Sequence, residues 1–435
     1  MLICRPEQSP LEILGEKLTA DPSRVVLRPF HLAWQSNVSE PSRAAQLVAD
    51  ILAMGDDQAE LELGLIWKDF SERHWQIGQI FDERFREVAE DLALDEARVS
   101  PVKRRVIGAY FCHEYSYAAA ALMNPSVVPH PDQSGIADDQ LRFVMSMRAV
   151  GEGHISSIAF REGIMGPGSR FQLWPQSGPA MAAVADDRHR CETDEPVDVH
   201  RLAGSTISNS VLFPVTEAQR NGLEDLRLVQ FTHDGGEKEY LGTYTAYSGR
   251  EIRSELMRTR DFGSFTLEPL VGRAARHKGM ALFPRKIDGR YCMIARQDGK
   301  NITILASDSL NEWDDEGEPL IRPRFPWELV QMGNCGSPIE CDAGWILLTH
   351  GVGAMRKYSL GAALLDKENP GRVLARTACP ILSAAESDRE GYVPNVVYTC
   401  GATAIGDRLF IPYGISDSAI GFATTTVDAL LASMG

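Results

Sequence analysis

Residues 281–307 read ALFPRKIDGRYCMIARQDGKNITILAS, and this stretch decides the fold. Three short apolar runs are separated by the turn sequences KIDGR and QDGKN. An Asp-Gly pair between two apolar runs favours a tight turn that joins antiparallel strands. The stretch therefore predicts three consecutive strands of one antiparallel sheet.

The same plan recurs along the second part of the chain. The corresponding positions Phe283, Pro338 and Val396 are 55 and 58 residues apart, a spacing that suits one four-stranded propeller blade with its loops. Five such units predict an all-β domain, a five-bladed β-propeller over residues 126–435, with a sandwich or a barrel as alternatives. The four further units are residues 141–160, 226–249, 337–366 and 395–425.

Residues 1–125 have a different pattern and are predicted to form an N-terminal segment with an α-helical extension. Between residues 41 and 93, apolar residues recur at steps of three and four with charges between them, which is the pattern of amphipathic helices. The Pro-rich stretch VVPHPDQSG at 127–135 ends this helical part. We expect the extension either to pack on another subunit of a homo-oligomer or to close one side of a pocket.

Composition disfavours several classes of partner. The 435 residues, 44% of them hydrophobic, can bury a large globular core. A net charge of −16 disfavours nucleic acid and anionic membranes. No run approaches the ~20 apolar residues of a membrane helix, and the N-terminus lacks the pattern of a secretory signal, which predicts a cytoplasmic protein. Eight cysteines without a C-x-x-C pair predict reduced thiols and no metal site.

The charged residues of the five units are expected to meet at one place. The inner strands of a propeller converge on a central channel, so equivalent positions of distant units come together. Carboxylates, guanidinium groups and a histidine suit a small oligosaccharide, because fixed donors and acceptors orient its hydroxyl groups. The residues at these positions are Arg148, Asp225, Arg227, Lys278, Arg296, Glu340, His350, Glu390 and Asp417.

One stretch, GLEDLRL at 222–228, resembles the E-D-P-R segment of glycoside hydrolase family 130, the β-mannoside phosphorylases and β-mannosidases. The resemblance runs in order from residue 124 to residue 430 and also implies a five-bladed propeller. The other matching stretches include ALFPRKIDGRYCMIAR, GSPIECDAGWILLTHGVG, REGYVPNVVYTCGA and IPYGISDSAIGFAT.

The resemblance implies an inverting attack on a β-mannoside without metal or cofactor, with Asp225 as the general acid. Because the neighbouring Arg227 lowers the pKa of such a carboxyl, burial has to offset that effect if Asp225 is to donate a proton. A plain salt bridge among Glu224, Asp225 and Arg227 is the structural alternative.

Further residues are assigned to substrate binding. The resemblance implies that Arg148 and Asp417 contact the sugar. The alternatives are that Arg148 only forms an ion pair with Glu152 and that Asp417 only belongs to an ordinary turn. Asn124 and His154 are candidates for the rim of the pocket. The alternatives are that the segment around Asn124 packs in the core and that His154 caps a turn. For phosphate, the resemblance points to four residues, with Gly279 where an Asn is usual: Lys278, Arg296, His350 and Tyr358.

The second reactant separates a hydrolase from a phosphorylase. At the position that resembles a phosphate-binding Lys, the chain has Glu340, and a carboxylate beside phosphate is unfavourable in a partly dehydrated pocket. We therefore expect hydrolysis of β-mannosides, with β-1,2-linked manno-oligosaccharides as substrates and Glu340 or Glu390 as the base. Glu340 could instead bind a sugar hydroxyl. The alternatives are a phosphorylase that uses inorganic phosphate, releasing mannose 1-phosphate, and a propeller that binds sugar without catalysis.

Overall fold

The structure is a computed structural model that describes residues 9–32, 42–176, 178–186 and 194–435. The chain forms two compact units. The propeller unit consists of Met1–Pro22, Tyr117–Gln176 and Ala183–Gly435, and the helical unit of Ser23–Ser116 and Ser177–Ala182. The two units interleave along the chain, whereas the sequence predicts a single boundary after residue 125.

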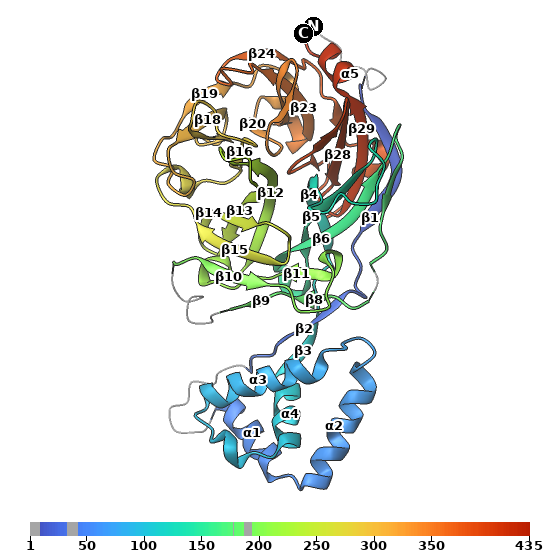
Figure 1. Ribbon diagram of the computed structural model, residues 1–435, viewed down its shortest axis with the longest axis vertical. Coiled ribbons are helices and arrows are strands. Elements are labelled where there is room, and N and C mark those ends of the chain that lie inside the picture. The colour runs from blue at the N-terminus through green and yellow to red at the C-terminus, as the bar shows by residue number, and fades with distance from the viewer. Residues whose placement is uncertain (1–8, 33–41, 177, 187–193) are drawn as a thin grey trace. The chain divides into compact units, whose positions relative to one another are not determined.

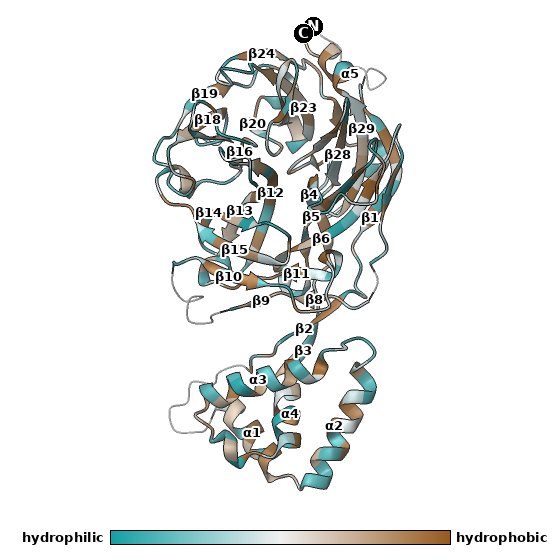
Figure 2. Ribbon diagram, viewed as in Figure 1, coloured by the Kyte–Doolittle hydropathy of each residue, from teal (hydrophilic) through white to brown (hydrophobic). Residues whose placement is uncertain are grey.

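The described part of the helical unit contains four α-helices. The Ser42 hydroxyl accepts a hydrogen bond from the Ala45 amide at 3.1 Å, which caps the first helix. In the third helix, Ile77, Phe81 and Phe85 are spaced four residues apart and form a buried stripe; brown and teal segments alternate along α2 and α3 in Figure 2. The elements are β2 (Val25–Pro29), α1 (Arg43–Ala53), α2 (Asp56–Phe70), α3 (Ile77–Asp91), α4 (Pro101–Tyr110), β3 (Cys112–Ser116) and β8 (Met181–Ala182).

The propeller unit contains five groups of antiparallel strands, which follow one another around a centre in chain order (Figure 1). Blade 1 comprises β4 (Ala121–Pro129), β5 (Leu141–Val150), β6 (Ser156–Met165), β7 (Phe171–Leu173) and β11 (Ser210–Leu212). Blade 2 comprises β12 (Gly222–Thr232), β13 (Lys238–Tyr247), β14 (Ile252–Thr259) and β15 (Ser264–Pro269), extended by β10 (Val197–His200) and β9 (Val184–Ala185).

The remaining three blades complete the propeller. Blade 3 comprises β16 (Ala281–Leu282), β17 (Tyr291–Ala295), β18 (Ile302–Ser307) and β19 (Glu318–Ile321). Blade 4 comprises β20 (Gln331–Asn334), β21 (Ile339–Cys341), β22 (Gly344–Val352), β23 (Tyr358–Leu365), β24 (Val373–Arg376) and β25 (Leu382–Ser383). Blade 5 comprises β26 (Val397–Tyr398), β27 (Thr403–Ile405), β28 (Arg408–Ile415), β29 (Ala419–Thr426) and β1 (Glu12–Thr19), and α5 (Val427–Ala432) follows it. The predicted five-bladed propeller with a helical extension is confirmed.

Strand β1 closes the propeller. It pairs antiparallel with β29, from Glu12 opposite Thr424 to Thr19 opposite Ala419. The last blade therefore takes its outermost strand from the start of the chain. This pairing joins segments some 400 residues apart in sequence and leaves β29 without an open edge, which an antiparallel sheet otherwise exposes to other strands.

Apolar side chains between neighbouring blades form the cores. Leu282 and Met293 of blade 3 pack with Phe231 of blade 2, and Phe283 packs edge to face on the fully buried Trp345 of blade 4. Burial of a side chain such as Phe283 contributes ~1.5–3 kcal/mol. The turn before β17 follows its sequence, because Asp288 and Gly289 both have positive φ, as a type I′ turn requires.

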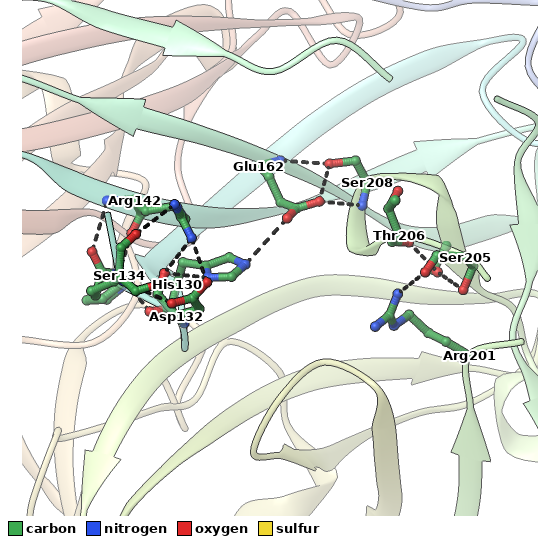
Figure 3. Close-up of polar contacts among 12 residues, drawn as sticks. His130, Asp132, Ser134, Arg142, Glu162, Arg201, Ser205, Thr206 and Ser208 are labelled. Carbon is green, nitrogen blue, oxygen red and sulfur yellow. Dashed lines mark hydrogen bonds and ion pairs between the residues drawn. The ribbon is translucent and has the colours of Figure 1, made fainter. Parts of the chain in front are cut away.

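Figure 3 shows a polar cluster inside blade 1, and none of its labelled residues is among those that line the pocket described below. Glu162 on β6 accepts hydrogen bonds from the Ser208 amide at 3.0 Å and hydroxyl at 2.8 Å, and its other oxygen lies 3.4 Å from His130 Nε2. Arg142 donates to Asp132 at 2.8 Å. The cluster fastens the connections around β5 and β6 and explains why these polar groups are tolerated close to a core.

Three sequence expectations concern other features of the chain. Of the cysteines that the structure describes, five are free thiols and Cys379 is disulfide-bonded, whereas the sequence predicts reduced thiols. Within the described ranges, no cluster of three or more metal-ligating side chains occurs. None of the helices that the structure describes is long and apolar enough to cross a membrane.

Candidate functional site

Four blades contribute to one pocket at the inner strands of the propeller. The space within it, including the part that is open to solvent, is about 300 Å³. Gly333 allows the close packing of its wall, because a Cβ there would collide with the His350 ring. The lining residues are Asp225, Arg227 and Thr245 of blade 2, Lys278, Gly279 and Arg296 of blade 3, Gly333, Asn334 and His350 of blade 4, and Tyr398 of blade 5.

A bulge in β12 positions Asp225. The register of β12 with β13 shifts between Glu224 and Arg227, and Asp225 has a φ of 56°. In a regular strand, adjacent side chains point to opposite faces, but at this bulge both Glu224 and Asp225 reach the guanidinium group of Arg148. An unfavourable backbone conformation is thus retained where it brings two carboxylates to one cation.

Two side chains of blade 1, Arg148 and Asn124, contact the carboxylates of Glu224 and Asp225. Arg148 donates to Glu224 at 2.6 Å, to Asp225 at 3.4 Å and to the Ser156 hydroxyl at 2.8 Å. Asn124, which also has a positive φ of 50°, donates from Nδ2 to Asp225 Oδ1 at 2.6 Å. The structure therefore brings the predicted residues Asn124, Arg148 and Asp225 into direct contact.

The charges around Asp225 decide its protonation state. Burial, the largest influence, raises the pKa of the Asp225 carboxyl, but Arg148, Arg227, Asn124 and Lys278 together lower it below its usual value. The condition set by the sequence, that burial should offset Arg227, is therefore not met in the structure. Asp225 is a carboxylate at neutral pH.

Two neighbouring carboxyl groups behave differently. Burial raises the pKa of Glu224, with Arg148 acting against it and Asp225 adding to it. Asp417, in the turn between β28 and β29, has its pKa raised to about 6 by burial and by the charge of Asp225, against the effects of Arg148 and Arg356. Glu224 and Asp417 thus hold a proton more readily than Asp225.

The pocket also has a cationic wall. Arg227 is only 4% exposed; it donates to the Tyr398 hydroxyl and to its own strand at the Asp225 carbonyl, 3.3 Å away. Arg296 NH1 lies 3.5 Å from His350 Nε2. Burial, Arg296 and Arg227 hold the pKa of His350 well below its usual value, so its imidazole is neutral. Lys278 adds a further positive charge to this wall.

Tyr358 supports the pocket without lining it. Its ring stacks on His350 at a centroid distance of 5.8 Å, and its hydroxyl accepts a hydrogen bond from Gln331 at 3.3 Å. This contact orients the imidazole. Tyr358 is therefore placed to act on a ligand only through His350.

The two predicted bases do not line the pocket. Glu340, with 35% of its side chain exposed, forms a bidentate pair with Arg285 at 3.0 and 3.1 Å, and Lys367 lies 3.8 Å away. The Arg285 side-chain hydrogen bonds are the main reason that the pKa of Glu340 is lowered. Glu390 is exposed in the loop between β25 and β26. Neither residue is among the described residues that line the pocket together with Asp225.

His154 occupies an exposed loop between β5 and β6. Its Nδ1 atom lies 3.4 Å from the Tyr392 hydroxyl, and the two rings are 5.9 Å apart. His154 has a positive φ of 61°, which is an uncommon backbone conformation for a residue other than glycine. The contact joins the loops of blades 1 and 5 and does not bring His154 to the described lining of the pocket.

Sequence reasoning missed some residues of the site. Glu224 was considered only as part of a salt bridge, and Tyr398, Asn334 and Thr245 were not singled out although they line the pocket. For Tyr398 the signal was available, because it lies in the stretch VVYTCGA, next to matched residues. Thr245 lies on a regular strand, and nothing in its local sequence distinguishes it from other buried threonines.

Comparison with known proteins gives relatives of one kind. A 1,2-β-oligomannan phosphorylase of Thermoanaerobacter sp. (strain X514) is 35% identical over 233 residues, which are 52% of this chain and 74% of that protein. A β-1,2-mannobiose phosphorylase of Listeria innocua serovar 6a is 32% identical over 227 residues, which are 51% of this chain and 62% of that protein.

Solved structures show the same fold. A β-1,2-mannobiose phosphorylase from Listeria innocua in complex with β-1,2-mannobiose superposes with a TM-score of 0.51 at 21% identity, covering 72% of this chain and 92% of that one. A structure from work on family 130 glycoside hydrolases that target β-1,2 mannosidic linkages in Candida mannan gives 0.52 at 19% identity, covering 72% and 86%. The sequence pattern of family 130, described as β-1,4-mannooligosaccharide phosphorylase, matches residues 204–435. Since this match covers more than half of the chain, the protein belongs to glycoside hydrolase family 130, whose members are enzymes that act on glycosidic bonds.

Proposed function

We propose that the protein is a phosphorylase that cleaves β-mannosides, with β-1,2-linked manno-oligosaccharides as its substrates, and transfers the mannosyl group to inorganic phosphate. One observation carries this proposal. Among the described residues that line the pocket, Asp225 is the only carboxylate, whereas Arg227, Lys278 and Arg296 are cations. Such a pocket suits an anionic nucleophile better than water.

The chemistry of the two reactions differs in what it needs from the protein. An inverting hydrolase needs a second carboxylate to take a proton from the attacking water. Phosphate is already an anion and needs positive groups that bind and orient it, for which Arg and Lys are suited. Glu340 motivated the expectation of hydrolysis, and its pairing with Arg285 outside the pocket lining removes that argument. The matched relatives from Thermoanaerobacter and Listeria, which are phosphorylases, add support.

In the proposed reaction, an oxygen of phosphate attacks the anomeric carbon from the face opposite the glycosidic bond. The carbon–oxygen bond breaks, its electron pair stays on the leaving oxygen, and a proton from Asp225 completes the new hydroxyl group. The products are mannose 1-phosphate and an oligosaccharide shortened by one unit. Arg148, Asn124 and Asp417, which surround Asp225, are proposed to bind hydroxyl groups of the mannosyl unit.

The product decides between the two activities. The protein is incubated with β-1,2-mannobiose or β-1,4-mannobiose, with and without phosphate, and the products are separated by anion-exchange chromatography. We expect phosphate-dependent mannose 1-phosphate from the β-1,2 substrate. Phosphate-independent release of mannose would contradict the proposal and restore the hydrolase alternative.

A further inference from the structure

Asp225 lies among more positive than negative charge. Residues from several strands and loops surround this carboxylate. Each of them either changes the pKa of Asp225 or has its own pKa changed by the charge of Asp225. The cations are Arg148 on β5, Arg227 on β12 and Lys278 before β16, the carboxyl groups are Glu224 on β12 and Asp417 after β28, and the other groups are Asn124, Tyr398 and Cys400.

This surrounding creates a difficulty for the proposed reaction. An acid has to carry a proton before it can donate one, but the cations keep the pKa of Asp225 below its usual value. Two of these three cations, Arg227 and Lys278, also line the pocket, together with Arg296. Two of the three cations that lower the pKa of Asp225 are thus also among the groups that would receive phosphate.

A phosphate dianion bound to Arg227 and Lys278 would offset their charge and add a negative charge of its own beside Asp225. Both effects favour the neutral form of a carboxyl group. We propose that the binding of inorganic phosphate makes Asp225 take up a proton, so that the nucleophile prepares the acid for its own reaction. This inference rests on the proposed phosphorylase function and adds to it a coupling between phosphate binding and protonation.

The proton balance is closed over one turnover. Asp225 takes one proton from solution when HPO₄²⁻ binds and gives it to the leaving oxygen during the transfer. The attack of HPO₄²⁻ on the anomeric carbon first yields a phosphate monoester with one negative charge and its hydroxyl proton. That proton is released when the ester becomes a dianion, so that the proton taken from solution is returned.

Other groups near the pocket could also take the proton. His350 lines the pocket and is neutral because of burial, Arg296 and Arg227, so a bound anion favours its protonation as well. Glu224 and Asp417 already hold a proton more readily than Asp225. A test therefore has to assign the proton to a residue as well as count it.

Sulfate is the appropriate probe, because it is a tetrahedral dianion that does not titrate near neutral pH. Calorimetric titration of the full-length protein with sulfate at pH 7.5, in two buffers with different ionisation enthalpies, measures the protons taken up on binding. We expect an uptake that approaches ~1 proton per sulfate, and a sulfate affinity that falls as the pH rises. Sulfate binding without proton uptake would overturn the inference.

Asp225→Asn and His350→Asn assign the proton. The amide introduced by Asp225→Asn is similar in size to the carboxyl group but cannot titrate, so we expect this substitution to abolish the uptake and to make the sulfate affinity nearly independent of pH. We expect the uptake to remain in His350→Asn. Uptake that persists in Asp225→Asn and disappears in His350→Asn would assign the proton to His350 and overturn the inference. Thermal unfolding curves check that both variants are folded.

The outcomes for the two proposals can be told apart. If mannose 1-phosphate forms but sulfate binds without proton uptake, the phosphorylase function stands and the coupling is wrong. If sulfate does not bind to an enzyme that uses phosphate, the coupling is also wrong, because it requires only a tetrahedral dianion. If mannose forms without phosphate, the phosphorylase function itself is wrong.

Discussion

The bulged region of β12 around Asp225 and the hairpin of β21 and β22 around Glu340 both place a carboxylate beside an arginine. Asp225 meets Arg148 at 3.4 Å in the pocket, whereas Glu340 meets Arg285 at 3.0 Å on a partly exposed surface. By distance alone, the second pair is the stronger one. Only the first pair lies in the pocket, at the inner strands of several blades, with Arg227 and Lys278 as further cations beside Asp225.

The backbone explains the difference. At Glu340, β21 pairs regularly with β22, so that the side chain alternates in the ordinary way, and its partner Arg285 lies over the ring of Trp345. At Asp225, the shift in register turns two consecutive carboxylates toward Arg148. The Asp225–Arg148 pair is part of a site because the irregular strand β12 directs it toward the channel. Opposite charges at short distance are not sufficient for a site, as the Glu340–Arg285 pair shows.

The largest expected effect separates Asp225 from Glu340 by activity. We expect Asp225→Asn to lower kcat for phosphorolysis of β-1,2-mannobiose by ~10²–10⁴-fold, because the amide cannot donate the proton. Glu340→Gln is the matched control, and we expect its kcat to stay within a few-fold of the unmodified protein. Both rates are measured at saturating phosphate. A loss of similar size in Glu340→Gln would return Glu340 to the catalytic machinery.

A second comparison concerns the lysines of the two regions. Lys278 lines the pocket, whereas Lys367 lies 3.8 Å from Glu340. We expect Lys278→Met to raise the KM for phosphate by about 10–100-fold, since a hydrogen bond to a charged group contributes ~1.5–3 kcal/mol. Lys367→Met should leave this KM unchanged. Equal effects of the two substitutions in a phosphate titration would argue against the cationic wall as the phosphate site.

The pH profile sharpens the comparison further. Glu224 is a negative neighbour of Asp225 and also shares Arg148 with it. Without that charge, the pKa of Asp225 falls, so the proton needed for catalysis is lost at lower pH. We therefore expect Glu224→Gln to move the alkaline limb of the kcat/KM profile to lower pH. A profile that only decreases in height would leave Glu224 a merely structural role.

The sequence was sufficient for the fold because its signals were local and repeated. Turn sequences such as Asp288-Gly289 recur between apolar runs. Only a few all-β architectures are built from five repeats of such a unit. The contribution of β1 to the last blade was not predicted, because its pairing with β29 depends on contacts between the two ends of the chain. Nothing in an isolated eight-residue strand indicates its partner.

The site was predictable only in part, and Glu340 shows why. Strand β20 ends at Asn334 and β21 begins at Ile339, so that the inner strand of blade 4 is interrupted. A change of one residue in register reverses the face that a side chain takes, and the length of such an interruption cannot be read from sequence. Asp225 was identified because it lies within the matching GLEDLRL stretch, whereas the bulge that aims it became visible only in the structure.

The smallest expected effect is on stability and concerns Glu340 again. Arg285 lowers the pKa of Glu340 in the folded protein, so the pair stabilises the fold above the pKa of Glu340 in the unfolded chain, ~4.3, and this contribution is lost as the pH falls through the folded value. Because the side chain is 35% exposed, solvent screens the pair, and we expect Glu340→Gln to lower the free energy of unfolding at pH 7 by less than about 1 kcal/mol.

Urea unfolding at pH 7 and at pH 3 measures this difference between the unmodified protein and Glu340→Gln. We expect the difference between the two midpoints to shrink at the lower pH, as protonation removes the charge of Glu340, and also at pH 7 in high salt, which screens an exposed pair. A difference that is larger at pH 3 than at pH 7 would mean that the pair does not stabilise the fold. The bidentate contact with Arg285 would then serve only to keep Glu340 directed away from the channel.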